Sequence, residues 1–281
     1  MVRQTRQSQV TGQSSQSMIE AAVESSPPLD RTLRCRYEMK YVISKSKAAA
    51  IESFIRHYLE LDPFSKLYPD GYYPIVSLYL DSDNMQLCME SLRGSLKRFK
   101  LRIRSYTYHP EYPRFVEIKR RVNRIIIKNR ARIKSKDMAA LLSGQYVPPL
   151  DNDKDSMNTI KQFQLYMKSV NAGPKILIRY RRCAYEGKMN NRLRITFDHD
   201  LCYRASTDTE VLFDEGNWQP NPETIRNVIL EIKFTGRYPA WLGRMATHFN
   251  LIQRSMSKYA TSVKQAHALK FCAPTLMSKV Y

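Results

Sequence analysis

Cations at alternate positions of one predicted strand are the residues in this sequence best placed to do chemistry. Within 97–106, side chains alternate between the two faces of a strand, so Lys100, Arg102 and Arg104 project from one face. The residues between them are apolar and project from the other face. Three adjacent cations repel one another, unless open water or a polyanion lies between them. The pattern therefore points either to open water or to binding of a polyanion, depending on whether other strands repeat it.

Four other predicted strands carry charges in the same alternating way. They span residues 34–43, 114–121, 192–198 and 228–234, and in each one a charged face is opposed by an aliphatic or aromatic face. The charged positions, in chain order, are Glu38 and Lys40, Glu117 and Lys119, Arg194 and Asp198, and Glu231 and Lys233. A further set on 124–133 (Lys128, Arg130, Arg132) either extends this charged surface or lies on the outside of a hairpin.

The overall charge limits the class of partner. The 281 residues carry a formal net charge of +20, which favours a polyanion: nucleic acid, an anionic membrane surface, nucleotides or polyphosphate. The five cysteines form no Cys-x-x-Cys pair, which argues against a disulfide framework or a zinc site and fits a reducing compartment. No apolar run approaches the roughly 20 residues of a membrane span. We expect a cytoplasmic protein without a transmembrane segment.

The order of elements predicts an α+β protein built on antiparallel strands joined by hairpins, with helices at the joints. Helical spacing of apolar residues predicts helices over 45–58 and 155–170, and one or two helices over 239–267. Residues 1–30, rich in Gln, Ser and Thr, predict a disordered tail. The expected organisation is one domain over 31–268, followed by a short tail over 269–281.

Two architectures are compatible with these strands. A half-solvated antiparallel sheet with its charged face outward is the commonest arrangement. Alternatively the sheet closes, so that the charged faces line an interior and the helices pack outside. A lumen of cations with a few carboxylates is costly to build without a ligand, and an anionic ligand carrying a divalent ion would offset that cost.

Seven short motifs follow one another along the chain. They are Arg36-x-Glu38-x-Lys40-Tyr41, Lys100-x-Arg102-x-Arg104, Glu117-Ile118-Lys119-Arg120, Arg182-x-Ala184-Tyr185, Arg194-Ile195-Thr196-Phe197-Asp198, Leu230-Glu231-Ile232-Lys233 and Ser257-Lys258-Tyr259. In this order they resemble the polyphosphate polymerase domain of the vacuolar transporter chaperone (VTC) complex, one of the triphosphate tunnel metalloenzymes, the CYTH-like group. The resemblance covers about residues 31 to 265, and the set as a whole is specific although each motif alone is weak.

The resemblance implies a closed antiparallel β-tunnel of about eight strands with helices packed outside. It also implies ATP as phosphoryl donor, a linear polyphosphate as acceptor and product, and Mn²⁺ or Mg²⁺ as cofactor. Glu231 would be the likeliest metal ligand, with Glu38 and Glu117 as weaker candidates. The residues that would hold phosphates are Lys40, Arg102, Arg104, Lys119, Arg182, Arg194, Lys233 and Lys258, with Ser257 as a hydrogen-bonding neighbour.

One position departs from the wider group, which often has Glu-x-Glu-x-Lys on its first strand. Arg36 replaces the first Glu, which counts against a two-metal triphosphatase and favours the polymerase branch. Metal-dependent hydrolysis of triphosphates or nucleoside triphosphates remains an alternative, as does a binding module without turnover. RNA ranks third and no nucleic-acid partner is expected, because aromatic residues such as Tyr37 and Phe99 fall on the face opposite the charges.

Overall fold

The computed structural model describes residues 36–107, 109, 111–123, 125–187, 193–211, 216–254 and 256–268. The tails predicted over 1–30 and 269–281 lie outside the described residues. Within the described ranges, no helix is both long and apolar enough to cross a membrane. The described chain divides into two compact units, unit 1 from the segments 36–73, 181–199 and 226–254, and unit 2 from 74–180, 200–225 and 256–268. That both belong to one domain over 31–268 stays a prediction.

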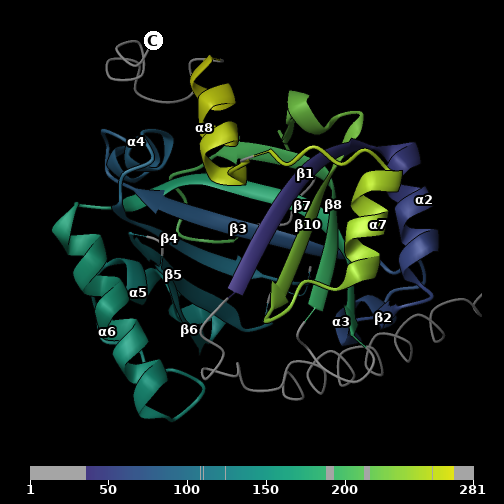
Figure 1. Cartoon of the computed structure of the whole chain (residues 1–281). Coiled ribbons are helices and arrows are strands. Elements are labelled where there is room, and N and C mark those ends of the chain that lie inside the picture. The colour runs from purple at the N-terminus through teal and green to yellow at the C-terminus, as the bar shows by residue number, and fades with distance from the viewer. Residues whose placement is uncertain are drawn as a thin grey trace, which may run out of the picture. The chain divides into compact units, whose positions relative to one another are not determined.

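The described strands form one ten-stranded antiparallel sheet, which confirms the α+β prediction (Figure 1). Their hydrogen-bonded order is β1-β10-β8-β7-β3-β4-β5-β6, and two short strands pair off this path, β2 with β7 and β9 with β8. Strands β7 (Gly173–Gly187) and β8 (Leu193–Ala205) are long and contribute residues to both units.

Unit 1 packs two helices against the apolar faces of its strands. It contains β1 (Arg36–Ser44), α2 (Lys45–Ile55), β2 (Leu59–Leu61), α3 (Pro63–Lys66), β10 (Asn227–Thr235) and α7 (Ala240–His248). Ile51 of α2, Leu242 of α7 and Leu230 of β10 lie in one buried cluster. Because the apolar residues alternate along β1 and β10, their charged neighbours are turned to the other face.

In unit 2, other helices likewise pack against the apolar faces of the strands. Its elements are β3 (Tyr73–Asp81, from Pro74 on), α4 (Gln86–Leu92), β4 (Lys97–Ser105), β5 (Arg114–Val122), β6 (Ile125–Ile133), the 3₁₀ turns Ser135–Asp137 and Pro222–Thr224, α5 (Met138–Leu142), α6 (Lys154–Ser169), β9 (Gln219–Pro220) and α8 (Lys258–Ala268). Phe163 of α6 and Leu141 of α5 pack with Ile103 and Ile118 of the sheet. Asp153 is the N-cap of helix α6, and its carboxylate accepts a hydrogen bond from the Ser156 backbone N–H at 2.8 Å.

The expected closure of the sheet is not made by strand pairing within the described residues. β1 and β6 are the two ends of the hydrogen-bonded order. The outer edge of β1 is occupied by a different segment, since Tyr41 bridges to Gln253 and the Arg254 N–H donates to the Lys40 carbonyl at 2.8 Å. These backbone groups of β1 are therefore already satisfied, and closure of the tunnel by another route stays a prediction.

Most element boundaries agree with the sequence predictions to within a few residues. The helix predicted over 45–58 ends at Ile55, and the helix predicted over 155–170 spans Lys154–Ser169. The stretch 62–74 is preceded by β2 and contains α3. This segment matters because it supplies Asp62 to the charged face of unit 1.

Candidate functional site

Charged side chains of unit 1 gather on one face because three strands align them in register. Lys40 of β1 lies directly opposite Glu231 of β10, and Glu38 lies opposite Lys233. Lys233 in turn lies directly opposite Arg194 of β8 in the strand register. The alternation predicted from the sequence thus places cations and carboxylates side by side across the strands.

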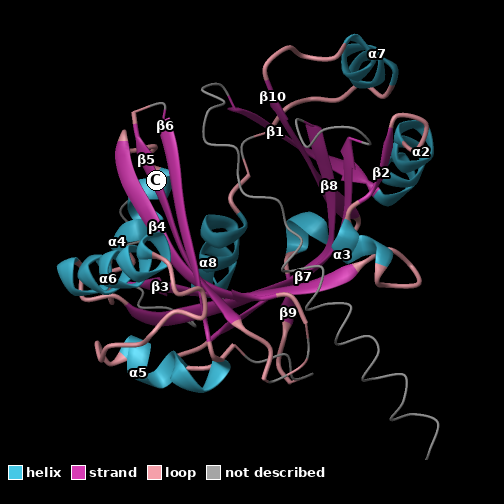
Figure 2. Cartoon of the chain, turned by 90° about the horizontal axis from the view of Figure 1, so that it is seen from below, coloured by secondary structure: helices cyan, strands magenta, loops and turns pink. Residues whose placement is uncertain are grey.

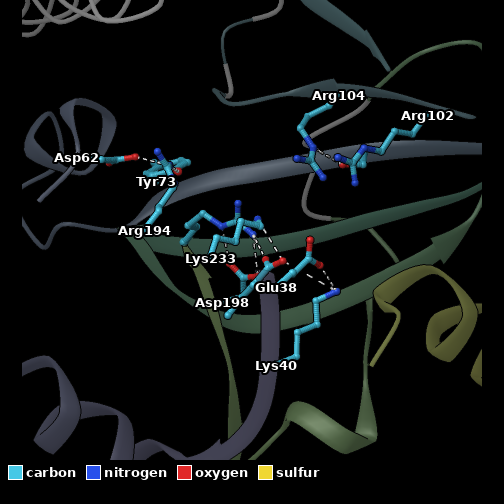
Figure 3. Close-up of polar contacts among 12 residues, drawn as sticks. Glu38, Lys40, Asp62, Tyr73, Arg102, Arg104, Arg194, Asp198 and Lys233 are labelled. Atoms are coloured by element: carbon cyan, nitrogen blue, oxygen red, sulfur yellow. Dashed lines mark hydrogen bonds and ion pairs between the residues drawn. The ribbon is translucent and has the colours of Figure 1, made fainter. Parts of the chain in front are cut away.

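The cations of this face each lie within ion-pair distance of a carboxylate. Lys40 Nζ is 2.9 Å from Glu38 Oε1 and 4.0 Å from Glu231 Oε1, and Lys233 Nζ is 3.1 Å from Glu231 Oε1. Arg182 Nη2 approaches the other Glu231 oxygen at 3.9 Å. Figure 3 shows Lys40 extended toward Glu38. Glu231 is thus surrounded by positive charge.

Two fully buried aspartates orient the guanidinium groups of unit 1. Arg182 donates two hydrogen bonds to Asp198, Nε to Oδ1 at 2.6 Å and Nη2 to Oδ2 at 2.9 Å. Arg194 donates from Nη2 to Asp62 Oδ2 at 2.5 Å (Figure 3). The other Asp62 oxygen accepts from the Ser65 N–H at 2.7 Å at the start of α3. Burial lowers the pKa of Arg194, but Tyr73 and Asp62 outweigh burial and raise it.

The donor set of unit 1 fits a hard divalent cation of the kind bound through phosphates. Mg²⁺ and similar ions are held by one or two carboxylates together with water and substrate phosphates, and Glu38 and Glu231 flank the Lys40 ammonium. Thr196, directly opposite Glu231, is buried and its hydroxyl has no hydrogen-bond partner within the described structure. Among the described residues no group of three His, Cys, Asp or Glu side chains forms a site by itself, so such an ion would need the phosphates as ligands.

In unit 2 a second charged face runs over four strands. Arg102 of β4 lies opposite Tyr79 of β3 and Glu117 of β5, which is itself opposite Arg130 of β6. Lys100 lies opposite Lys119 of β5. Like charges directly opposite each other on one face destabilise a sheet.

Glu117 is the carboxylate at the centre of this second face. Its Oε2 accepts from Arg102 Nε at 2.5 Å, and its Oε1 is 3.4 Å from Arg130 Nε. Burial alone raises the pKa of Glu117, but Arg102, Arg104 and Arg130 outweigh burial and hold the pKa well below its usual range. Both carboxylate oxygens face guanidinium groups, so Glu117 fits a charge-neutralising role better than that of a metal ligand.

Two arginines of β4 also contact hydroxyl groups. Arg104 is buried and donates from Nε to Ser77 Oγ at 2.9 Å, and Arg102 donates from Nη1 to the Tyr79 hydroxyl at 3.0 Å. Burial raises the pKa of Tyr79, but the charges of Arg102, Arg104 and Lys100 outweigh burial and lower the pKa to about 8. A buried phenol this acidic reports a strongly positive potential on this face.

Helix α8 brings the predicted Ser257 and Lys258 to this second face. Lys100 donates from Nζ to Ser257 Oγ at 2.8 Å, and Lys258 Nζ lies 4.9 Å from the centre of the Tyr180 ring. The alignment of α8 is fixed by Tyr259, which stacks on Tyr79 with ring centres 4.7 Å apart and donates a hydrogen bond to buried Asp81. Residues 157 positions apart in the sequence are thereby joined.

Comparison with known proteins identifies the family. A sequence model of the VTC domain matches residues 35–267. The chain belongs to the VTC domain family. Among solved structures, the chain is similar to the PH1819 protein of Pyrococcus horikoshii OT3, at 12% identity with a TM-score of 0.40, over 82% of this chain and 99% of that chain. No curated protein matches.

The residues predicted for this VTC domain fall into the two faces just described. Unit 1 holds Glu38, Lys40, Arg182, Arg194, Glu231 and Lys233, and unit 2 holds Arg102, Arg104, Glu117, Lys119, Ser257 and Lys258. Their roles stay predictions. Of the three basic residues on β6, Arg130 joins the second face through Glu117, whereas Arg132 forms an ion pair with Asp151.

Lys100 shares the alternating pattern with Arg102 and lies on the second face, as the sequence indicates. Three further residues of these faces, Asp62, Tyr79 and Tyr180, were not identified from the sequence. They carry no local signal, since their contacts come from distant segments. Asp198 was placed on the right face of its strand, but its pairing with Arg182 could not be read from spacing.

Replacement of Glu117 by Gln should destabilise the protein in a pH-dependent way. Arg102 and Glu117 form a partly buried ion pair, 24% and 13% exposed, and removing the Glu117 charge leaves Arg102 poorly compensated, at a cost of about 1–3 kcal/mol. A carboxylate whose folded pKa is depressed stabilises above its unfolded pKa, about 4.3 for Glu, and loses that effect as pH falls. Denaturant unfolding should show the full difference between wild type and Glu117→Gln at pH 7, and a shrinking difference below about pH 4.

Glu60→Gln provides the matched control, because Glu60 forms an exposed ion pair with Lys66 at 3.0 Å. Its effect should stay within about 1 kcal/mol. A loss for Glu117→Gln that is equal at every pH would show that Glu117 acts through shape rather than charge.

Proposed function

We propose that this VTC domain is an ATP-dependent polyphosphate polymerase, which transfers the terminal phosphoryl group of ATP to the end of a linear polyphosphate. Family membership supports the polyphosphate-related part of this proposal. The observation that carries it is the charged face of unit 2, where Lys100, Arg102 and Arg104 follow one another on β4. The central carboxylate there is Glu117, bound by Arg102.

The two faces differ in how their positive charge is balanced. On the face of unit 1, carboxylates lie within 4.0 Å of Lys40, Arg182, Arg194 and Lys233. On the face of unit 2, Arg104 and Lys100 donate to serine hydroxyls, which carry no charge. A chain of phosphates is the ligand that supplies one negative charge per repeat to such a row of cations.

The residue types suit phosphoryl transfer. The reaction forms a bond between the terminal phosphorus of ATP and an end oxygen of polyphosphate, and breaks the bond that releases ADP. It needs alignment and charge neutralisation more than covalent help from the protein. Guanidinium groups suit phosphate oxygens, and the ion pairs of Arg102 with Glu117 and of Arg182 with Asp198 orient these two side chains.

In this proposal the divalent metal ion binds on the charged face of unit 1. Glu231 and Glu38 would hold Mn²⁺ or Mg²⁺, which when bound supplies charge neutralisation to phosphate oxygens. Lys40 and Lys233, now in contact with these carboxylates, would be released to phosphates when the ion binds. The Asp62 and Asp198 carboxylates keep Arg194 and Arg182 oriented meanwhile.

Product analysis should identify the reaction most directly. Incubation of the protein with ATP and Mn²⁺ should give ADP and a ladder of polyphosphate chains on a gel. The double variant Arg102→Ala/Arg104→Ala should lose the ladder, because it removes two of the cations that hold the chain. Calorimetry should show wild-type binding of triphosphate that weakens as salt is added.

The same gel separates the alternatives. Orthophosphate without a ladder would identify a hydrolase, and unchanged ATP with intact triphosphate binding would identify a binding module. Lys66→Ala is the matched control, because Lys66 is an exposed cation of unit 1 paired with Glu60, and it should leave the ladder intact. Absence of triphosphate binding at low salt would contradict every form of the proposal.

Replacement of Glu231 by Gln should change the metal dependence of turnover. Gln keeps the shape and removes the negative charge, so turnover should fall at least about tenfold at limiting Mn²⁺, a loss of about 1.4 kcal/mol in binding. Raising Mn²⁺ should recover part of that turnover. Metal-free binding of triphosphate should hold or tighten, because an anion beside Lys233 is lost.

A titration of rate against Mn²⁺ for wild type and Glu231→Gln provides the measurement. If Glu231 only neutralises Lys40 and Lys233, the variant should lose stability while its normalised titration curve superimposes on that of wild type. Superimposable curves would therefore remove Glu231 as a metal ligand.

A further inference from the structure

The hairpin between β5 and β6 ends in apolar side chains that are exposed among the described residues. Ile125 is 65% exposed and Ile126 43%, and Val122 and Ile127 are also exposed. Leu96, 67% exposed, belongs to the same tip, because the Asn123 N–H donates to its carbonyl at 2.8 Å. We call these five residues the hairpin tip. Contiguous exposed apolar residues of this kind mark an interaction site.

The apolar character of the hairpin tip covers both faces of the ribbon. Ile125 pairs with Val122 and Ile127 with Arg120 on one face, whereas Ile126 pairs with Arg121 on the other. Figure 2 shows β5 and β6 running side by side to this common end. Asn123, which follows β5, is in the left-handed region at φ +55°. Because both faces of the ribbon are apolar at this end, burying the tip requires an apolar environment on both sides. Docking of one face on a flat protein surface would leave the other face exposed.

Cations surround the base of the hairpin tip. Arg98 lies directly opposite Arg121, and Lys119 directly opposite Lys128. Arg121 is anchored at the tip, because its Nε donates to the Asn123 carbonyl at 2.8 Å. Burial and the charge of Arg121 lower the pKa of Arg98. An anionic surface at the base of the tip would relieve this repulsion.

We propose that the hairpin tip inserts into an anionic lipid surface, with its apolar end among the acyl chains and its basic base at the lipid phosphates. Binding of this kind combines buried apolar area with attraction between basic residues and anionic lipids. Repulsion between cations argues against docking of the hairpin tip on a second copy of this chain. β6 is an end strand of the sheet, and antiparallel pairing of two β6 strands would bring Lys128 and Arg130 of both copies together.

Vesicle flotation tests this proposal with the full chain. Wild type should float with vesicles of phosphatidylcholine and phosphatidylserine, and much less with phosphatidylcholine alone. The variant Ile125→Ser/Ile126→Ser removes apolar area from both faces of the tip at exposed positions. It should float at least about tenfold less with the anionic vesicles, while its binding of triphosphate in solution stays at the wild-type level.

The matched control is Leu165→Ser/Ile252→Ser, which removes two side chains that are 67% and 79% exposed elsewhere on the molecule. It should float as wild type does. Equal flotation of wild type and Ile125→Ser/Ile126→Ser would overturn the proposal, as would equal binding to neutral and anionic vesicles. Absence of flotation, together with a wild-type dimer that this variant converts to monomer, would assign the tip to a second copy instead.

Discussion

Repulsion between cations on one face of the sheet is the constraint on which this structure depends. Lys100 lies directly opposite Lys119, and Lys119 directly opposite Lys128, so the register that buries the apolar face also brings like charges together. The buried cluster of unit 2 fixes that register, because a one-residue slip would turn Ile103 and Ile118 away from α5 and α6. Hydrophobic burial thus offsets the repulsion between these cations.

The two units handle this constraint in different ways. Unit 1 interleaves carboxylates with its cations, and the buried Asp62 and Asp198 lock two guanidinium groups in place. Unit 2 concentrates positive charge around Glu117 and turns Arg104 and Lys100 toward hydroxyls. The first arrangement suits a metal-bound phosphate, and the second suits a longer polyanion.

Period-two alternation predicted the fold well because it is a local property of each strand. It gave the strands on either side of 122–125 nearly to the residue, and it placed Glu231 and Lys233 on one face before their partners were known. The order of the motifs predicted the family.

What sequence reasoning could not supply were contacts between distant segments. The β2–α3 segment brings Asp62 to Arg194 across 132 positions, and Tyr259 reaches Asp81 across 178. Closure of the sheet was expected from the resemblance, but Gln253 and Arg254 occupy the edge of β1. No local pattern in 250–255 indicates a segment that would cover a strand edge.

The ionisation of Tyr79 gives the most direct test that the β4 cations are held ready for a polyanion. Its phenol pKa is about 8 because Arg102, Arg104 and Lys100 outweigh burial. A bound polyanion cancels part of that potential and should raise the pKa. Ultraviolet titration of wild type, with Tyr79→Phe to identify the signal, should show one tyrosine ionising near pH 8 in chloride. Its pKa should rise when triphosphate replaces chloride at equal ionic strength. An unchanged pKa in saturating triphosphate would contradict the account.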